Sequence, residues 1–174
     1  MLKPDLVIDR EFASLCWKLT ESEMLNLATS LKEEGCRDPI IYWDNCSVFP
    51  ILDGHNRYKI CNDNNIPYNL MGIKFATRED AICWILRNQL GRRNVSEVQR
   101  QHLIARLVAE RSKTPGRPKE DGESTQSHAS GSTVAGVARE AGVSESTVQR
   151  AIAADKAQAA LAIKAPRVAQ EALL

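Results

Sequence analysis

A stretch with almost no apolar side chain divides this chain into two parts of unequal length. Residues 112–132 read SKTPGRPKEDGESTQSHASGS and consist mostly of serine, glycine, proline and charged residues. Such a segment cannot bury enough apolar surface to offset the conformational entropy that it would lose on ordering. We therefore expect a flexible linker at 112–132, a larger folded part before it and a helical module at 133–174 after it.

The linker contains the run PGRPK at 115–119, which allows two interpretations. A Gly-Arg-Pro core is typical of an AT-hook, in which the arginine enters the minor groove of A·T-rich DNA. A charged hinge exposed to solvent explains the same residues more simply, and we favour it.

Local signals in the larger part alternate between helix and strand. TESE at 20–23 forms a capping box, and the helix that it opens is predicted to end at Gly35. The β-rich runs PIIYWD (39–44) and VFPIL (48–52) predict a hairpin or a close strand pair. RYKICNDN predicts a short helix, and PYNLMGIKF predicts a further strand.

Two more helices complete the larger part. Thr77 caps the run REDAICWILRNQLG, which ends at Gly91, and Ser96 opens the next helix with a Ser-x-x-Gln capping box. Helices interleaved with strands over about a hundred residues favour an α+β domain with a small mixed sheet. We place this domain at 1–94 and a connecting helix at 95–111.

Composition excludes several classes of protein. The net charge is only +1, so the chain as a whole does not present the basic field of many nucleic-acid-binding proteins. Its five cysteines show no metal-ligand spacing and no CxxC pair, which favours small core residues in a reduced, cytoplasmic protein. The sequence shows neither a secretory signal nor a run of about 18 apolar residues, so we expect no membrane association and no metal site.

The segment STVAGVAREAGVSESTVQRAIAAD at 132–155 has the pattern of a helix-turn-helix. Apolar residues at 134, 137, 138 and 141 form one helix face, and Gly142 is predicted to end that helix at a tight turn. Ser144 caps a second helix, whose Val148 and Ile152 are predicted to pack back on the first.

A helix-turn-helix places its second helix in the major groove of DNA. The residues on the available face are Ser144, Glu145, Ser146, Thr147, Gln149 and Arg150. Glutamine pairs well with adenine, and arginine with guanine or a phosphate. A helical hairpin that binds nothing is the structural alternative.

The run ILDGHNRYK raises a separate question, because a buried strand is followed at once by five polar or small residues. We call residues 53–57 the DGHNR loop. Glycine permits close backbone approach, the next helix start favours anions, and Arg57 offers a planar fork for phosphate. His55 could donate to a phosphate or satisfy a carbonyl, while Asp53 could cap the helix or bind Arg57. A phosphate cradle and a plain capped turn are both consistent with this stretch.

Three segments together resemble the ParB/sulfiredoxin superfamily, most closely the ParB-like N-terminal domains of plasmid and phage replication and partition proteins. The segments are LATSLKEEGCRDPIIYW, ILDGHNRYKIC and AICWILRNQLGRRNVSEVQR, and the resemblance covers roughly residues 5–111. The positions that match family motifs are Leu27, Ser30, Leu31, Gly35, Pro39 and Ile40 in the first segment, Gly54 and Arg57 in the second, and Asn88 and Arg92 in the third.

The resemblance implies a nucleotide cofactor. In this superfamily the Gly-x-x-Arg loop binds nucleotide phosphates: partition proteins use CTP, sulfiredoxins use ATP, and a related serine kinase uses ADP. CTP or ATP would be bound here by Asp53, Gly54, His55, Asn56, Arg57, Asn88, Arg92 and Arg93. DNA is the implied partner, with a homodimer as the arrangement to test.

The chain departs from the family motifs at three positions. Arg87 stands where partition proteins have a glutamate that helps to bind Mg²⁺, and Asn56 replaces an arginine of the loop, so Mg²⁺ binding and CTP hydrolysis do not carry over. His55 stands where sulfiredoxins have their catalytic cysteine, so a sulfinic acid reductase is not expected. No catalytic residue is assigned.

These observations give three functional hypotheses. The first is a nucleotide-responsive DNA-binding protein of the ParB-like type, acting in plasmid or phage replication, partition or transcriptional regulation. The second is a nucleotide-dependent enzyme, kinase-like or NTP-hydrolysing. The third is a DNA-binding regulator whose N-terminal domain binds no nucleotide and serves protein interaction.

Overall fold

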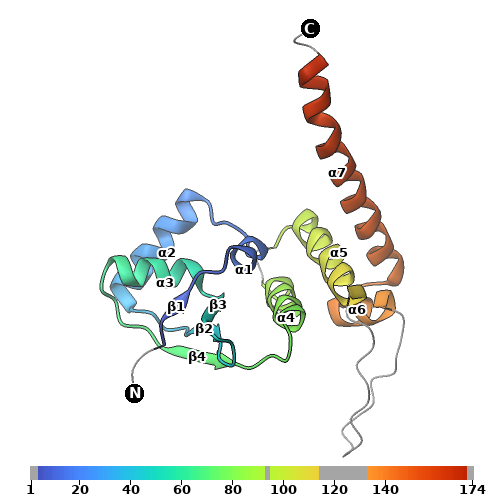
Figure 1. Ribbon diagram of the computed structural model, residues 1–174. Helices are drawn as coiled ribbons and strands as arrows, with labels where there is room; N and C mark the ends of the chain where they lie inside the picture. The colour runs from blue at the N-terminus through green and yellow to red at the C-terminus, as the bar shows by residue number, and fades with distance from the viewer. Residues whose placement is uncertain (1–3, 93–94, 114–132, 172–174) are drawn as a thin grey trace, which may run out of the picture. The chain divides into compact units, whose positions relative to one another are not determined.

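The computed structural model describes the backbone of residues 4–92, 95–113 and 133–171, and the side chains of these residues except 113 and 161–171 (Figure 1). The chain forms two compact units, residues 1–85 and 86–174, with the division inside one helix. Each unit is described by itself below. No helix among the described residues combines the length and the apolar character that crossing a membrane requires.

The first unit is built on a mixed sheet of four strands. The strands are β1 (Leu6–Val7), β2 (Ile40–Trp43), β3 (Phe49–Asp53) and β4 (Leu70–Ile73), in the order β1-β3-β2-β4. β2 and β3 are antiparallel, as the predicted strand pair requires, whereas β1 runs parallel to β3 and β4 parallel to β2. The chain is thus a mixed α/β protein, compatible with the α+β class predicted from the sequence.

The first unit also contains the helices α1 (Arg10–Leu15), α2 (Glu21–Glu34), α3 (His55–Asp63) and the first part of α4 (Arg78–Leu90). Of these helices, α1 packs on β3. α3 packs on β2, and α2 packs on α3 (Figure 1). One core cluster joins Leu6, Ile40 and Ile51 to surrounding tyrosines, and a second joins Leu31, Ile60 and Cys61 between α2 and α3.

Capping contacts confirm three predicted helix boundaries of this unit, whereas α3 begins at His55, two residues before the helix predicted over RYKICNDN. The Oγ1 atom of Thr20 accepts from the N–H of Glu23 at 3.3 Å, and the Glu23 carboxylate accepts from the N–H of Thr20 at 2.8 Å. Gly35 ends α2 with φ +76°, and the Thr77 hydroxyl caps α4 by accepting from the N–H of Asp80 at 3.1 Å. These contacts are local, which is why short sequence patterns predict them.

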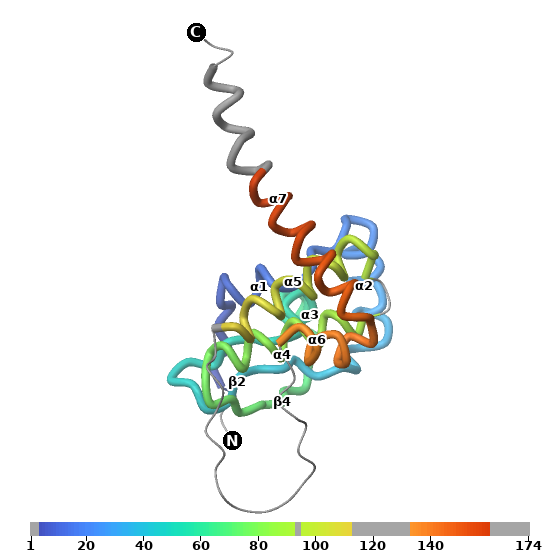
Figure 2. The backbone as a smooth tube through the Cα atoms, turned by 90° about the vertical axis from the view of Figure 1, so that its right-hand side faces the viewer, coloured from blue at the N-terminus to red at the C-terminus, as the bar shows by residue number. Residues whose placement is uncertain are grey.

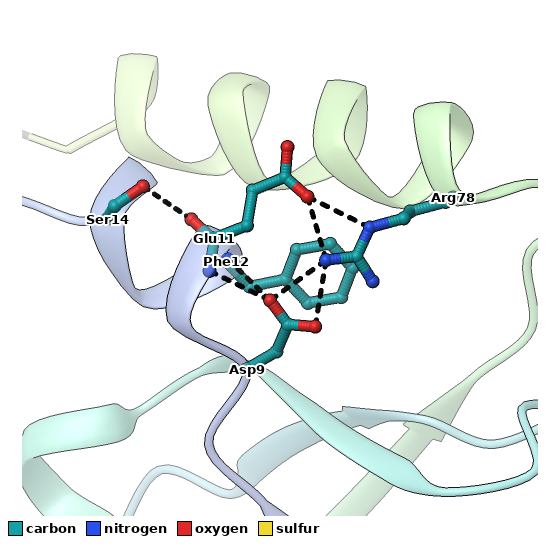
Figure 3. Close-up of polar contacts among 5 residues, drawn as sticks. All are labelled: Asp9, Glu11, Phe12, Ser14 and Arg78. Atoms are coloured by element: carbon teal, nitrogen blue, oxygen red, sulfur yellow. Dashed lines mark hydrogen bonds and ion pairs between the residues drawn. The ribbon is translucent and has the colours of Figure 1, made fainter.

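The sequence analysis did not predict β1 and α1, which are tied to the rest of the unit by an ionic cluster (Figure 3). Asp9 caps α1 by accepting from the N–H groups of Glu11 and Phe12 at 2.9 and 3.1 Å. Arg78, at the start of α4, donates to the Asp9 carboxylate at 2.8 Å and to the Glu11 carboxylate at 2.8 Å. Its guanidinium lies over the Phe12 ring, 4.4 Å from the centroid.

The second unit is helical over its described residues. It contains the end of α4, then α5 (Glu97–Lys113), α6 (Thr133–Ala141) and α7 (Glu145–Glu171). α5 is the predicted connecting helix; it packs against both α6 and α7, which also pack against each other (Figure 2). The fully buried side chains at this junction include those of Ile104, Leu107, Val137 and Val148.

Candidate functional site

The turn between α6 and α7 has the geometry that the sequence predicts. Gly142 has φ +66°, in the left-handed region that glycine adopts at least cost. The N–H of Val143 donates to the carbonyl of Ala138 at 3.0 Å, and the N–H of Gly142 donates to that of Arg139 at 3.4 Å. This pair of bonds is a Schellman motif, which ends α6 and redirects the chain at once.

Ser144 begins α7 as predicted. Its Oγ atom accepts from the N–H of Thr147 at 3.2 Å, and its carbonyl accepts from the N–H of Val148 at 3.2 Å. The hydroxyl also lies 2.8 Å from that of Ser146 and 2.9 Å from that of Thr147. The first turn of α7 is therefore fixed by three small hydroxyl side chains.

The inward face of α7 includes one residue that was not predicted. Val148 is fully buried, as expected, and Ala151 is only 1% exposed. Ile152, predicted to pack beside Val148, is half-buried. Ala151 lies three positions after Val148, and this spacing places both on the side that faces α6 and α5.

The outward face of α7 is polar. Five of the six predicted DNA-contacting residues have exposed side chains, and they are Ser144, Glu145, Ser146, Gln149 and Arg150. The sixth, Thr147, is half-buried. The Nη2 atom of Arg150 donates to the Thr147 hydroxyl at 3.2 Å, and its Nε donates to the Ser146 carbonyl at 3.4 Å. The structure thus brings the predicted group together on the first two turns of one helix.

Ionic contacts that the sequence analysis missed attach α6 and α7 to the helices before them. The carboxylate of Glu140 binds the guanidinium of Arg87, and it binds that of Arg111 at 2.7 Å. The Nδ1 atom of His102 lies 2.7 Å from the Asp155 carboxylate. These pairs join residues far apart in the sequence, so no local pattern marks them. They fix α6 and α7 on α5, with the polar face of α7 left exposed.

The DGHNR loop lies in the first unit, where β3 leads into α3. Asp53 is the last residue of β3 and is 7% exposed. Gly54 follows with φ +91° and is the N-cap residue of α3, so it has no side chain with which to cap the helix. His55 and Asn56 are half-buried on the first turn, and the Nδ1 atom of His55 lies 3.8 Å from the sulfur of Cys16.

Arg57 is bound to the loop itself. Its Nη2 atom donates to the Asp53 carboxylate and to the Pro39 carbonyl, both at 3.2 Å, and its Nη1 lies 3.7 Å from the Asp38 carboxylate. A Cβ atom at Gly54 would lie only 3.1 Å from the Arg57 Nη2 atom. Of the two roles open to Asp53, the structure therefore shows the one in which it binds Arg57. In this conformation the Nη2 atom of Arg57 already donates hydrogen bonds to two protein oxygens.

The other predicted nucleotide-binding residues belong to different parts of the chain. Asn88 is half-buried near the end of α4, and Arg92 is exposed just after it, both in the second unit. Arg93 lies outside the described residues. The structure therefore brings together only the five residues 53–57, and a pocket completed by the other three stays a prediction.

Comparisons with known proteins add no assignment. No family model matches the chain, and no curated protein matches it at a significant level. The resemblance to the ParB/sulfiredoxin superfamily therefore rests on the sequence motifs alone. Among the described residues, no group of three or more histidine, cysteine, aspartate or glutamate side chains is placed to bind a metal ion.

Proposed function

We propose that the second unit binds double-stranded DNA, with α7 entering the major groove. The observation that carries this proposal is the exposed polar face on the first two turns of α7, directly after a glycine turn that packs α7 on α6. A helical hairpin with no ligand needs only the inward residues Val148 and Ala151. Because an exposed helix face is ordinarily polar, the proposal depends on the kinds of residue found there: Ser146, Gln149 and Arg150 together offer hydrogen-bonding groups suited to bases and phosphates.

The side chains of these residues suit different kinds of contact with DNA. Gln149 and Arg150 have the length to reach base edges, where an amide pairs with adenine and a guanidinium with guanine. Ser144 and Ser146 are short and lie at the helix start, which suits hydrogen bonds to a phosphate. Arg150 makes only exposed contacts at 3.2 and 3.4 Å within its own helix, so exchanging them for a base contact loses little.

The first unit suggests the biological process in which such DNA binding would take part. An α+β domain of ParB-like type ahead of a helix-turn-helix suits a protein of plasmid or phage replication, partition or transcriptional regulation. Such a protein would grip DNA as a homodimer, with two copies of α7 reading two half-sites.

The test of DNA binding starts from a randomised duplex library and the full chain. Sequences enriched over several rounds are labelled, and their affinity is measured by fluorescence anisotropy for the wild type and for Arg150→Ala. We expect the variant to bind about 5- to 150-fold more weakly, because a bidentate base contact contributes about 1–3 kcal/mol.

Arg37→Ala is the matched control, since Arg37 is an exposed arginine of the first unit that forms an ion pair with the nearby Glu34. It should bind the selected DNA like the wild type. Failure of the folded full chain to enrich any duplex would overturn the proposal. Equal losses in both variants would show that only overall charge matters.

A nucleotide site at the DGHNR loop is a second candidate, favoured by one observation. α3 begins at a left-handed glycine, which has no side chain with which to cap the helix, and the start of a helix favours anions such as phosphate. Binding through Arg57 would require the guanidinium to leave Asp53 or Pro39, so nucleotide binding would change the loop. An enzyme acting on the nucleotide remains the alternative within this candidate.

Calorimetric titration of the full chain with CTP, ATP, GTP and ADP, each with and without Mg²⁺, tests the second candidate. Saturable binding of one nucleotide, lost in Arg57→Ala and kept in Arg37→Ala, is the expected result. Turnover of the bound nucleotide, lost in Asp53→Asn or His55→Gln, would favour the enzyme. No binding by the folded wild type would leave the DGHNR loop as a structural turn.

A further inference from the structure

Two cysteines far apart in the sequence meet beside the DGHNR loop. Cys36 follows Gly35, whose left-handed backbone (φ +76°) ends α2 and directs the chain back towards α3. Cys36 packs against the cluster that contains Leu31, Ile60 and Cys61. The Cys36 thiol is close enough to the Cys61 thiol to contribute to the raised pKa of Cys61. Both are reduced in the structure.

The two thiols differ in accessibility. Cys36 is half-buried, and its sulfur donates a hydrogen bond to the carbonyl of Asp38 at 3.3 Å. Cys61 is fully buried on α3. Burial, together with the neighbouring Cys36 thiol, raises the pKa of Cys61 above its ordinary value. A small oxidant in solution therefore meets Cys36 first, while Cys61 stays protonated until a partner sulfur becomes electrophilic.

We propose that Cys36 and Cys61 form a redox modification site, at which a peroxide converts the two thiols into an intramolecular disulfide. The Cys36 thiolate attacks one peroxide oxygen, the O–O bond breaks, and water and a sulfenic acid result. The Cys61 sulfur then displaces the hydroxyl from the Cys36 sulfur, and the Cys61 proton leaves with it as a second water. Two thiols lose two electrons, and one hydrogen peroxide is reduced to two waters.

The bond would act on the segment that binds Arg57. Oxidation removes the proton that Cys36 donates to the Asp38 carbonyl. The carboxylate of Asp38 and the carbonyl of Pro39, which are two and three residues after Cys36, both contact Arg57. The closed loop, residues 36–61, contains β2, β3 and the whole DGHNR loop. The redox state of Cys36 is therefore linked to the conformation available to Arg57.

Peptide mapping of the full chain tests this proposal. The native protein is treated with a small molar excess of hydrogen peroxide, the remaining thiols are alkylated, and a non-reducing tryptic digest is analysed by mass spectrometry. Residues 33–37 and 60–74 form separate tryptic peptides with one cysteine each, so the disulfide joins two identifiable masses. We expect this linked pair, loss of two of the five thiols, and recovery of both with dithiothreitol.

Matched variants and a denatured control complete the experiment. Cys46→Ser removes a half-buried cysteine outside the pair and should leave the linked peptides unchanged, whereas Cys36→Ser should abolish them and leave the Cys61 thiol intact. Peroxide treatment of the chain in guanidinium chloride should give no preference for this pair. Overturning results are a folded wild type that keeps all its thiols, one that oxidises Cys36 to a sulfinic acid without a link, or one that links other cysteines in preference.

Discussion

Single residues in the first unit show how charges far apart in the sequence stabilise a fold whose local signals are weak. α1 has only six residues and β1 only two, lengths at which isolated elements do not form in water. Arg78 compensates for this by binding both Asp9 and Glu11 and by lying over the Phe12 ring. Its side chain is 41% exposed, so solvent screens each ion pair and each pair alone contributes little to stability. The cluster stabilises the fold because one guanidinium makes several contacts at once.

The cluster predicts a pH-dependent loss of stability in Arg78→Met. Burial alone would raise the pKa of Asp9, but hydrogen bonds from Arg78 and from the Phe12 and Glu11 N–H groups lower it below its ordinary value. A lowered folded-state pKa gives stability that is present above the unfolded-state pKa and lost as pH falls through the folded-state pKa. We expect Arg78→Met to lower the free energy of unfolding by about 1–2 kcal/mol at pH 7.

The difference from wild type should begin to shrink as pH falls below the ordinary pKa of aspartate, and it should be lost as pH falls through the lowered folded-state pKa of Asp9. Urea unfolding followed by tryptophan fluorescence at pH 7 and pH 3 measures both values. Arg37→Met, which breaks an exposed pair between neighbouring turns, is the control and should lower stability by no more than about 0.5 kcal/mol. An Arg78→Met deficit that stays constant across this pH range would contradict the assignment to Asp9.

At the scale of elements, the geometry of α7 depends on one glycine. A Cβ atom at Gly142 would meet nothing within 4 Å, so space does not restrict this position. The restriction is the backbone, because φ +66° is strained for residues other than glycine and, to a lesser degree, asparagine. The direction in which α7 leaves α6 is set by this left-handed residue together with the Ser144 cap.

The stability of variants at Gly142 should therefore depend on how readily the new residue adopts a left-handed backbone, and not on the size of its side chain. We expect Gly142→Ala to lower the free energy of unfolding by about 1 kcal/mol, and Gly142→Asn by less, although asparagine is the larger residue. Thermal unfolding followed by circular dichroism gives the order, and the affinity for selected DNA should fall in the same order. A variant series in which asparagine is worse than alanine would point to a steric cause instead.

Sequence patterns predict those elements whose signals are local. The Thr20 capping box, the Gly35 stop and the Gly142 turn are each complete within a few residues, and the structure confirms them. β1 was missed because its only signal is pairing with β3, more than forty residues later. Ala151 was not named in advance, although its helical spacing from Val148 places it on the same buried face.

The candidate sites show the same division between local and distant signals. The exposed face of α7 follows from helical periodicity, so its residues could be named in advance. The contacts of Arg57 could not, since the Pro39 carbonyl and the Asp38 carboxylate reach it through the fold. The Cys36–Cys61 pair and the two arginines on Glu140 are likewise products of tertiary packing, which a single sequence does not encode in any short pattern.

At the scale of the whole molecule, the two proposed functions belong to two different compact units. A substitution that removes one function should therefore leave the other intact. Arg57 belongs to the first unit and Arg150 to the second. Arg57 binds Asp53 and Pro39 in its own unit, and Arg150 binds Thr147 in its own helix. Effects of substitutions that share no partners add independently. In the absence of nucleotide, therefore, the loss of one arginine should not alter the function assigned to the other.

We expect the full chain with Arg57→Ala to bind selected DNA within about twofold of the wild type, a difference of less than about 0.5 kcal/mol. Arg150→Ala, in turn, should leave nucleotide titrations unchanged. Anisotropy and calorimetry on the same three proteins, with circular dichroism to establish that each is folded, make the comparison. If a folded Arg57→Ala loses DNA affinity as Arg150→Ala does, the two units act as one binding surface, and the nucleotide-free chain already couples the DGHNR loop to α7.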